Sequence, residues 1–246
     1  MVGQACWRFA ELIFTEPLVL LIQLDFFAVL SEWPLLVKGI AWTIGLTFVA
    51  ALLGVALGIV CAWTRVHGSP AWRALVGSYV ELILNTPFIV QLFFIFFGLP
   101  AAGIRLSPEV ASIIAMVMNL GAYAAEIVRA GIEATPRGQI MAAQSLGMRP
   151  LRVFVSIVLP PALQTVWPAM ASQIIIVMLG SAVCGQISTE ELSYAANLIQ
   201  SRNFRAFESF IIAALIYLGL AMILRKALSS VGSRLIFGRS QEATRA

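Results

Sequence analysis

The sequence predicts an all-α integral membrane protein with about five spanning helices. Hydrophobic residues fill 60% of the 246 positions and charged residues 11%, whereas a soluble domain is roughly 45–50% apolar and about 25% charged. Mean hydropathy is +0.93. So few charges cannot coat a soluble globule of this size, which argues against a soluble enzyme or a disordered chain. The net charge of only +4 does not indicate a nucleic-acid partner, and the predicted surroundings are a lipid bilayer.

Five long stretches of the chain are apolar enough to cross a bilayer. A hydrocarbon core about 30 Å thick needs roughly 20 apolar residues in a helix. Charged residues bound the first two stretches: Lys38 and Arg65 bound the first, and Glu81 and Arg105 bound the second. The five predicted spans are residues 39–64, 82–104, 110–128, 153–189 and 209–224.

The last three spans are less regular than the first two. The third contains one charge, Glu126, near its end. The fourth is too long for a single span, and Pro160, Pro161 and Pro168 punctuate it; proline removes a helical hydrogen bond. The fifth follows Glu208. An odd number of spans places the two termini on opposite sides of the membrane.

The N-terminal segment, residues 12–30, is apolar on average but contains Glu16, Pro17, Gln23 and Asp25. A charge near the bilayer centre costs about 2.5–3.5 kcal/mol. This segment is therefore predicted to be an interfacial or short extra helix, with a sixth span as the alternative. It lacks the features of a removable signal peptide. The predicted parts are an N-terminal segment 1–33, a transmembrane domain 34–232 with a cytoplasmic loop at about 136–152, and a tail 233–246.

Basic residues predict the orientation of the chain. Most of the 16 lysines and arginines lie in residues 65–73, in residues 129–152 and after residue 224. The positive-inside rule places these segments in the cytoplasm. The N-terminus is therefore predicted to lie outside and the C-terminus in the cytoplasm.

The cytoplasmic loop between the third and fourth spans has a pattern of its own. Residues 140–146 are good helix formers apart from Ser145. Gly147 follows where a helix can end in a left-handed residue, and Pro150 suits the first turn of a new helix. The pattern predicts two short helices that meet at a glycine turn along the membrane surface. The small side chains there permit close approach by another protein, but a connector that lies on lipid has the same pattern.

No residue cluster predicts catalytic or metal chemistry. Cys6, Cys61 and Cys184 are far apart and fit no metal-ligand spacing, so they are interpreted as small packing residues. His67, the one histidine of the sequence, is predicted to be a solvated loop residue.

Polar residues inside spans are the candidates for a substrate pathway, because such residues tend to face a cavity or a partner. Glu126 either pairs with Arg129 three residues later or faces a substrate ammonium group. Pro87 breaks the second span, and the break either lines a cavity or only improves packing. Gly54 and Gly58 form a G-x-x-x-G pair, which predicts close helix packing. The pathway candidates are Asn85, Thr86, Gln91, Asn119, Tyr123, Glu126 and Ser181.

Motifs in the loop and in the spans match one known family in order and spacing. The loop motif consists of Gly138-Gln139, Ala142-Ala143, Gly147 and Leu159-Pro160. The other motifs are Tyr79-Val80-Glu81, Thr86-Pro87, Gln91, Ala122-Tyr123, Glu126-Ile127-Val128-Arg129, Glu191-Leu192, Phe204, Glu208 and Tyr217. The loop motif resembles the EAA loop of ABC importer membrane subunits. Over roughly residues 26–230 the chain resembles the permeases for histidine, glutamate, glutamine, arginine and opines.

The resemblance implies a type I ABC importer fold with a coupling loop, in a bacterial inner-membrane subunit that moves polar amino acids or opines inward. It implies two cytoplasmic ATPase subunits, a second permease subunit, identical or homologous, and a periplasmic solute-binding protein. The binding protein is expected at the face that carries Glu190, Glu191, Arg202 and Arg205. The residues implied to couple to the ATPase are Gly138, Met141, Ala142, Ala143, Gly147 and Arg149.

The sequence also indicates where the energy for uptake comes from. Lys38 and Lys226 are the two lysines, and neither follows a G-x-x-x-x-G run, so the chain has no phosphate-binding loop. The chain is therefore predicted not to be an enzyme and to bind no cofactor. ATP and Mg²⁺ are expected to be used by the partner ATPase.

Three positions depart from the family pattern. Met141 replaces the glutamate of the EAA triplet, and Leu84 replaces an arginine before the Thr86-Pro87 turn. Residues 179–183 read Leu-Gly-Ser-Ala-Val where the family has Lys-Asp-Thr-Ser-Leu. A neutral wall at this stretch favours a second, different permease subunit over an identical one.

Two other classes of protein stay open at the level of sequence. An ion-coupled secondary carrier would need a buried proton or sodium site, for which Glu126 is the candidate. A non-transporting scaffold would use the Gly147 loop to bind a protein other than an ATPase.

Overall fold

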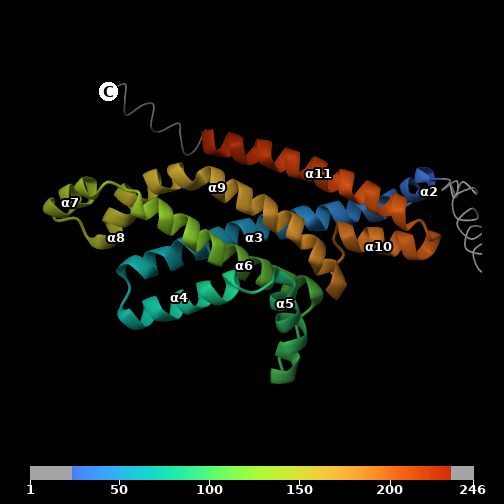
Figure 1. Cartoon of the computed structure of the whole chain (residues 1–246), viewed down its shortest axis with the longest axis horizontal. Coiled ribbons are helices and arrows are strands. Elements are labelled where there is room, and N and C mark those ends of the chain that lie inside the picture. The colour runs from blue at the N-terminus through green and yellow to red at the C-terminus, as the bar shows by residue number, and fades with distance from the viewer. Residues whose placement is uncertain (1–23, 234–246) are drawn as a thin grey trace, which may run out of the picture.

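The computed structural model describes residues 24–233, and the regular structure within this range is helical. The helices form an elongated bundle (Figure 1). In chain order they are α2 (Phe26–Leu30), α3 (Trp33–His67), α4 (Pro70–Leu84), α5 (Phe88–Phe93), η1 (Phe94–Gly98), η2 (Leu99–Ala102), α6 (Pro108–Glu133), α7 (Arg137–Ser145), α8 (Pro150–Val153), η3 (Phe154–Val158), α9 (Leu159–Gly180), η4 (Ser181–Ile187), α10 (Leu192–Asn203) and α11 (Ala206–Val231).

Four helical stretches of the described chain are long and apolar enough to cross a membrane, and a bent pair of helices makes a fifth. Three are α3, α6 and α11, and the fourth is the run Pro150–Ile187 from α8 to η4. The bent pair is α4 with the segment Phe88–Ala102. The predicted all-α membrane fold is confirmed, and the five spans agree when the bent pair counts as one.

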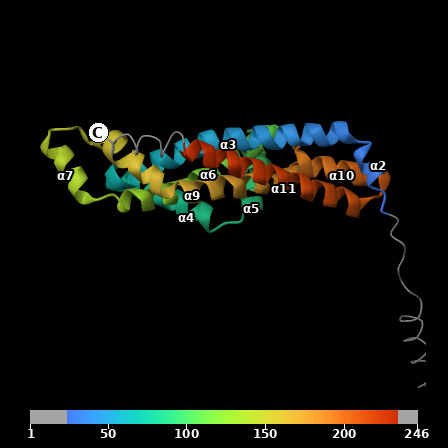
Figure 2. The same cartoon turned by 90° about the horizontal axis from the view of Figure 1, so that it is seen from above.

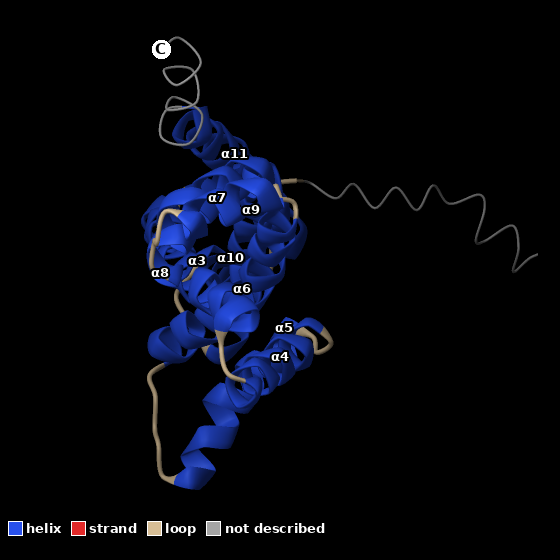
Figure 3. Cartoon of the chain, turned by 90° about the vertical axis from the view of Figure 1, so that its left-hand side faces the viewer, coloured by secondary structure: helices blue, strands red, loops and turns tan. Residues whose placement is uncertain are grey.

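The second predicted span was wrong in its bounds, whereas the break predicted at Pro87 is confirmed. Residues 82–104 do not form one helix, because α4 begins at Pro70, ends at Leu84 and is followed by a 113° bend. Pro87 has no N–H to continue the helical ladder. The segment Phe88–Ala102 then projects sideways from the bundle (Figure 1). Seen from the α7 end, α4 and α5 lie to one side of the other helices (Figure 3).

The fourth run is a single helical path of 38 residues with two irregular ends. At Phe154–Val158 the path widens into a π-helix directly before Pro160 and Pro161. The wider turn accommodates prolines that cannot donate to the carbonyls four residues earlier. At the other end, Ser181–Ile187 tightens into a 3₁₀-helix.

The two ends of the bundle carry different elements. Helices α2 and α10 lie at one end and α7 at the other, as both views show (Figures 1 and 2). Asp25 caps α2 by accepting from the Ala28 N–H (3.1 Å), and its own N–H donates to Glu208 (3.1 Å). The rest of the predicted interfacial segment lies outside the described residues, as does the tail from residue 234. Helix α10 was not predicted from the sequence.

The centre of the bundle is the contact between α3 and α6. A Cβ atom added to Gly58 would lie 2.4 Å from the Cβ of Ala124, and one added to Gly54 would lie 2.9 Å from the Cβ of Leu120. Only glycine permits this approach, since real Cβ atoms do not come so close. The prediction that Gly54 and Gly58 are packing residues is confirmed.

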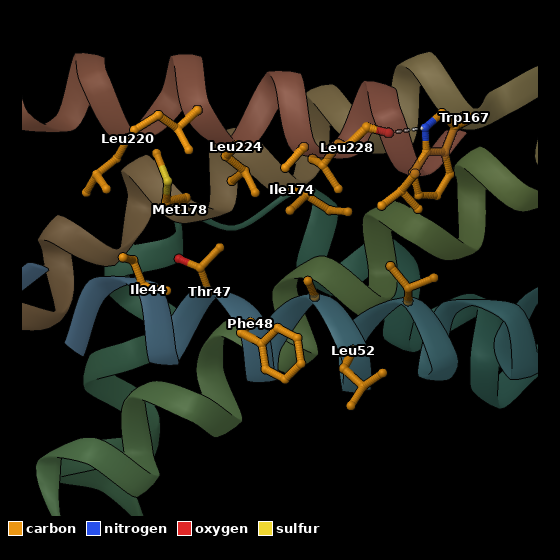
Figure 4. A pocket seen from close by; sticks show the side chains of 15 residues that line it. Ile44, Thr47, Phe48, Leu52, Trp167, Ile174, Met178, Leu220, Leu224 and Leu228 are labelled. Atoms are coloured by element: carbon orange, nitrogen blue, oxygen red, sulfur yellow. Dashed lines mark hydrogen bonds between the residues drawn. The ribbon is translucent and has the colours of Figure 1, made fainter. Parts of the chain in front are cut away.

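Helix α11 lies at the edge of the bundle, against α9 and α10. Between α3, α9 and α11 runs an apolar groove of about 530 Å³ (Figure 4). The indole N–H of Trp167 donates to the Leu228 carbonyl (2.9 Å) and joins α9 to α11 at one end of the groove. The walls offer almost no polar atoms, so this groove is not a site for a polar solute.

His67 is exposed, as the sequence predicted, but it lies in a helix and not in a loop. It is the last residue of α3, and its ring stacks on Trp63 with ring centroids 5.7 Å apart. Phe154 of η3 meets the His67 ring edge-on at 6.1 Å. The exposed histidine therefore also packs the end of α3 against η3.

Candidate functional site

The loop at the α7 end has a fixed backbone geometry. Gly147 has φ +74°, and its N–H donates to the Gln144 carbonyl (2.9 Å) while the Met148 N–H reaches the Ala143 carbonyl (3.3 Å). These two bonds form a Schellman motif, which ends a helix with a left-handed residue. Pro150 then begins α8. The predicted glycine turn is confirmed, but α8 has only four residues and continues into the long helix rather than standing alone on the surface.

The surface of this loop is apolar and open. Leu146 is 81% exposed and Met141 60% exposed, whereas Ala143 is buried. A groove of about 400 Å³ runs between α7 and η3, with walls from Gln139, Ala142, Ala143, Leu146, Met148, Ser156 and Ile157. A Cβ atom at Gly138 or Gly147 would meet nothing within 4 Å. The loop therefore presents a shaped apolar surface with room for another protein at one end of the bundle.

The break between α4 and α5 is held by one side chain, Gln91, which is 8% exposed. Its Nε2 donates to the carbonyls of Ile83 and Thr86 (2.9 Å each) on the two sides of the residue where α4 ends. Its Oε1 accepts from Nδ2 of Asn119 on α6 (3.0 Å). The structure thus brings Thr86, Gln91 and Asn119 together. A small cavity of about 80 Å³ adjoins Asn119, with walls that include Phe88 and Gly180.

The other pathway candidates are placed differently. Asn85 is exposed, and its Nδ2 donates to the Glu81 carbonyl (2.8 Å). Tyr123 is half-buried four residues beyond Asn119 on α6. Ser181 is buried at the junction of α9 and η4, where its hydroxyl donates to the Met178 carbonyl (2.6 Å). Ser181 therefore does not join the cluster of Thr86, Gln91 and Asn119.

Glu126 forms the ion pair that the sequence predicts, and one more. Its carboxylate lies 2.7 Å from the Arg129 guanidinium and also pairs with Arg65 at the end of α3. Arg129 in turn pairs with Glu133. Sequence spacing could not reveal Arg65, because it lies 61 positions away. With two arginine partners this carboxylate joins α3 to α6, and its charge is balanced within the described part of the chain.

Glu191 was expected on an exposed docking face and is instead fully buried. It caps α10 by accepting from the N–H groups of Ser193 (2.9 Å) and Tyr194 (2.8 Å), and it accepts from the Tyr217 hydroxyl of α11 (2.5 Å). A Cβ atom at Gly185 would lie 2.6 Å from its Oε1. Burial raises the pKa of the Glu191 carboxyl above its usual range, against the lowering effect of its three donors.

The other residues of the expected docking face form ion pairs, two of them on the surface and one with the buried Glu208. Glu190 pairs with Lys38 (2.5 Å), Arg202 with Glu32 (3.8 Å) and Arg205 with Glu208 (3.2 Å). Of the two glutamates, only Glu190 can reach solvent at this end of the bundle.

Replacing Glu191 with alanine is expected to destabilise the protein strongly, whereas Glu190→Ala is the near-neutral control. Glu191→Ala leaves Tyr217 and two backbone N–H groups without an acceptor, at about 1–3 kcal/mol for each buried donor. Glu190→Ala removes an exposed ion pair worth less than about 1 kcal/mol. Thermal unfolding of the purified protein in detergent measures both. Equal unfolding temperatures for the two variants would contradict this role of Glu191.

The fold and the loop together define a class: a multi-helix membrane transport subunit with a docking loop at one end. Residues 54–235 match the family model described as binding-protein-dependent transport system inner membrane component. The chain belongs to this family.

Individual relatives agree with the family assignment. The chain is 35% identical over 188 residues to the L-cystine transport system permease protein TcyB of Bacillus subtilis, covering 76% of this chain and 80% of that protein. It is 31% identical over 203 residues to the arginine transport system permease protein ArtQ of Bacillus subtilis, covering 82% and 93%. A solved structure of an amino acid ABC transporter with histidines superposes with a TM-score of 0.77 at 35% identity, covering 85% of this chain and 98% of that one. The fold is that of a type I ABC importer permease.

Proposed function

We propose that this chain is the permease subunit that moves polar amino acids, or close relatives such as opines, into the cytoplasm. The relatives named above, permeases for cystine and arginine, support this class of substrate. The observation that carries the proposal is the loop at the α7 end. A Schellman turn at Gly147 holds exposed Leu146 and Met141 on a shaped surface, which suits the docking of a partner that drives the helices.

The proposed motor is a pair of cytoplasmic ATPase subunits that bind Gly138, Met141, Ala142, Ala143, Gly147 and Arg149. The chain has no phosphate-binding loop, so ATP and Mg²⁺ belong to those partners. Closure of the ATPases would tilt the long helices as rigid bodies, because α8, η3 and α9 form one path from the loop into the bundle. A second permease subunit completes the pathway.

The proposed orientation places the α7 end in the cytoplasm and the α10 end outside. The positive-inside rule supports this, since the segments around Arg65 and Arg149 are rich in basic residues. The C-terminus then lies inside and the N-terminus outside. A periplasmic binding protein would deliver solute at the α10 end, near Glu190 and Arg202.

The proposed substrate pathway runs past the break between α4 and α5. Thr86, Gln91 and Asn119 form one hydrogen-bonded cluster there, with Asn85 and Tyr123 close along their helices. The cavity beside Asn119 also reaches Gly180, where a side chain has open space. Glu126 and Ser181 are engaged elsewhere and are assigned structural roles.

Reconstitution tests the proposal directly. The chain is co-purified with its proposed ATPase, second permease and binding protein, and the complex is placed in lipid vesicles. Uptake of radiolabelled cystine, glutamine and arginine is expected when ATP is supplied on the side of the membrane where the ATPase subunits lie. It is not expected from an imposed proton or sodium gradient alone. Accumulation driven by an ion gradient without ATP would refute the proposal, as would vesicles of the intact complex that transport neither these amino acids nor opines.

A further inference from the structure

Glu81 lies on α4, one turn before the break, and the coupling and pathway roles proposed above do not involve it. Its side chain is exposed. The ion pairs found within the described part of the chain do not include it. The positions three and four residues away on α4 are Ser78 and Gly77 before it and Leu84 and Asn85 after it. The carboxylate therefore has no counter-ion on its own helix.

Glu81 belongs to a line of polar side chains on the exposed face of α4. Ser78 and Asn85 lie three residues before and four residues after it, so all three share one helix face. All three are exposed, and we name this set the polar stripe. The opposite face of α4 carries Val80 and Ile83, which are buried against neighbouring helices. The exposed side of α4 thus carries the polar stripe beside large apolar side chains, Leu75 and Leu82 among them.

The polar stripe lies inside the apolar depth of the bundle. The hydroxyl of Tyr79, two residues before Glu81, donates to the Met118 carbonyl of α6 (2.6 Å). Glu126 lies at the charged end of the bundle. Met118 precedes it by eight residues on α6, so the contact with Tyr79 lies about 12 Å further into the bundle. A charge facing lipid at such a depth costs about 2.5–3.5 kcal/mol. This cost argues against lipid as the neighbour of Glu81.

We infer that the polar stripe lines a water-filled pathway and that the Glu81 carboxylate binds the ammonium group of an amino-acid substrate. The inference rests on the proposed import function. The 113° bend turns the Phe88–Ala102 segment away and leaves the stripe uncovered by its own chain, and broken helices line binding cavities in other transporters. An ammonium forms charge-assisted hydrogen bonds with a carboxylate, while Ser78 and Asn85 supply neutral donors for the substrate carboxylate.

Thiol labelling tests the water-filled face without knowledge of the substrate. In a background with Cys6, Cys61 and Cys184 replaced by alanine, Ser78→Cys reports on the stripe and Leu218→Cys on the exposed apolar face of α11. The intact complex in vesicles is treated with membrane-impermeant methanethiosulfonates of positive and of negative charge. We expect labelling at position 78 only, at least threefold faster with the cationic reagent, and loss of that preference in Glu81→Gln. Absence of labelling at position 78 would overturn the inference.

Uptake by the same complex tests the binding role. Glu81→Gln is expected to lower ATP-driven uptake of glutamine at least tenfold while the complex stays intact. Glu81→Asp is expected to keep part of the wild-type uptake. The control Glu109→Gln is expected to take up glutamine as the wild type does. Unchanged uptake in Glu81→Gln overturns the inference. So does dissociation of the complex, which would assign Glu81 to an ion pair with the second permease subunit. A wild-type complex without ATP-driven uptake would refute the import function instead, while the labelling result still decides whether the stripe meets water.

Discussion

Replacing Gly147 with valine is expected to lower ATP-driven uptake at least tenfold while the chain still folds and inserts. The residue has φ +74°, a conformation that costs a residue with a branched side chain about 1–3 kcal/mol. A Cβ atom there would meet nothing within 4 Å, so the change acts through the backbone and not through a clash. Loss of the left-handed turn would move Leu146 and Met148 and so misalign the docking surface.

The comparison with Gly147→Asn separates backbone strain from other causes. Asparagine enters the left-handed region more readily than other residues with a side chain. Solute uptake by the Gly147→Asn complex is therefore expected to lie between that of the wild type and that of Gly147→Val. Uptake and ATPase co-purification are measured on the same vesicles. Wild-type uptake in the valine variant would show that this turn does not transmit motion from an ATPase, and an equal loss in both variants would show that strain is not the cause.

Replacing Gly58 with alanine is expected to destabilise the protein, whereas Gly45→Ala on the same helix is expected to stabilise it. A Cβ atom at Gly58 would lie 2.4 Å from the Cβ of Ala124 and 2.9 Å from the backbone of Ala124 and Ala125. Helices α3 and α6 must then separate, and overpacking of this kind costs about 1–3 kcal/mol. A Cβ atom at Gly45 meets nothing within 4 Å, so only the helical preference for alanine remains, worth about 0.5–1 kcal/mol.

Thermal unfolding in detergent checks both substitutions, because the two are expected to move the unfolding temperature in opposite directions. A shift of the same sign in both variants would mean that the α3–α6 contact does not depend on a glycine at position 58. Gly58→Leu extends the series, and its destabilisation is expected to exceed that of Gly58→Ala since it adds a larger side chain at the same point.

Local sequence was sufficient for several features of the site. Gly147 and Pro150 specify the turn and the helix start that the structure contains, because both act within one helical turn. The pair Glu126–Arg129 follows from a three-residue spacing on one helix face. Pro87 predicts that α4 ends just before it, because proline has no N–H to continue the helix. The size and direction of that break depend on the helices around it, so the 113° bend could not be predicted.

The sequence alone determined that this chain crosses a membrane as helices, and it located the glycine turn and the helix break, because apolar runs, glycine and proline act over a few neighbouring positions. Only the tertiary structure decided which polar groups meet. Gln91 reaches Asn119 across 28 positions, Arg65 reaches Glu126 across 61, and Glu191 is buried by Tyr217 of another helix. The physical reason is that such meetings depend on how each helix is rotated about its axis and shifted along it. Those two quantities are set by the packing of whole helix faces, as at Gly54 and Gly58, and by no short stretch of sequence.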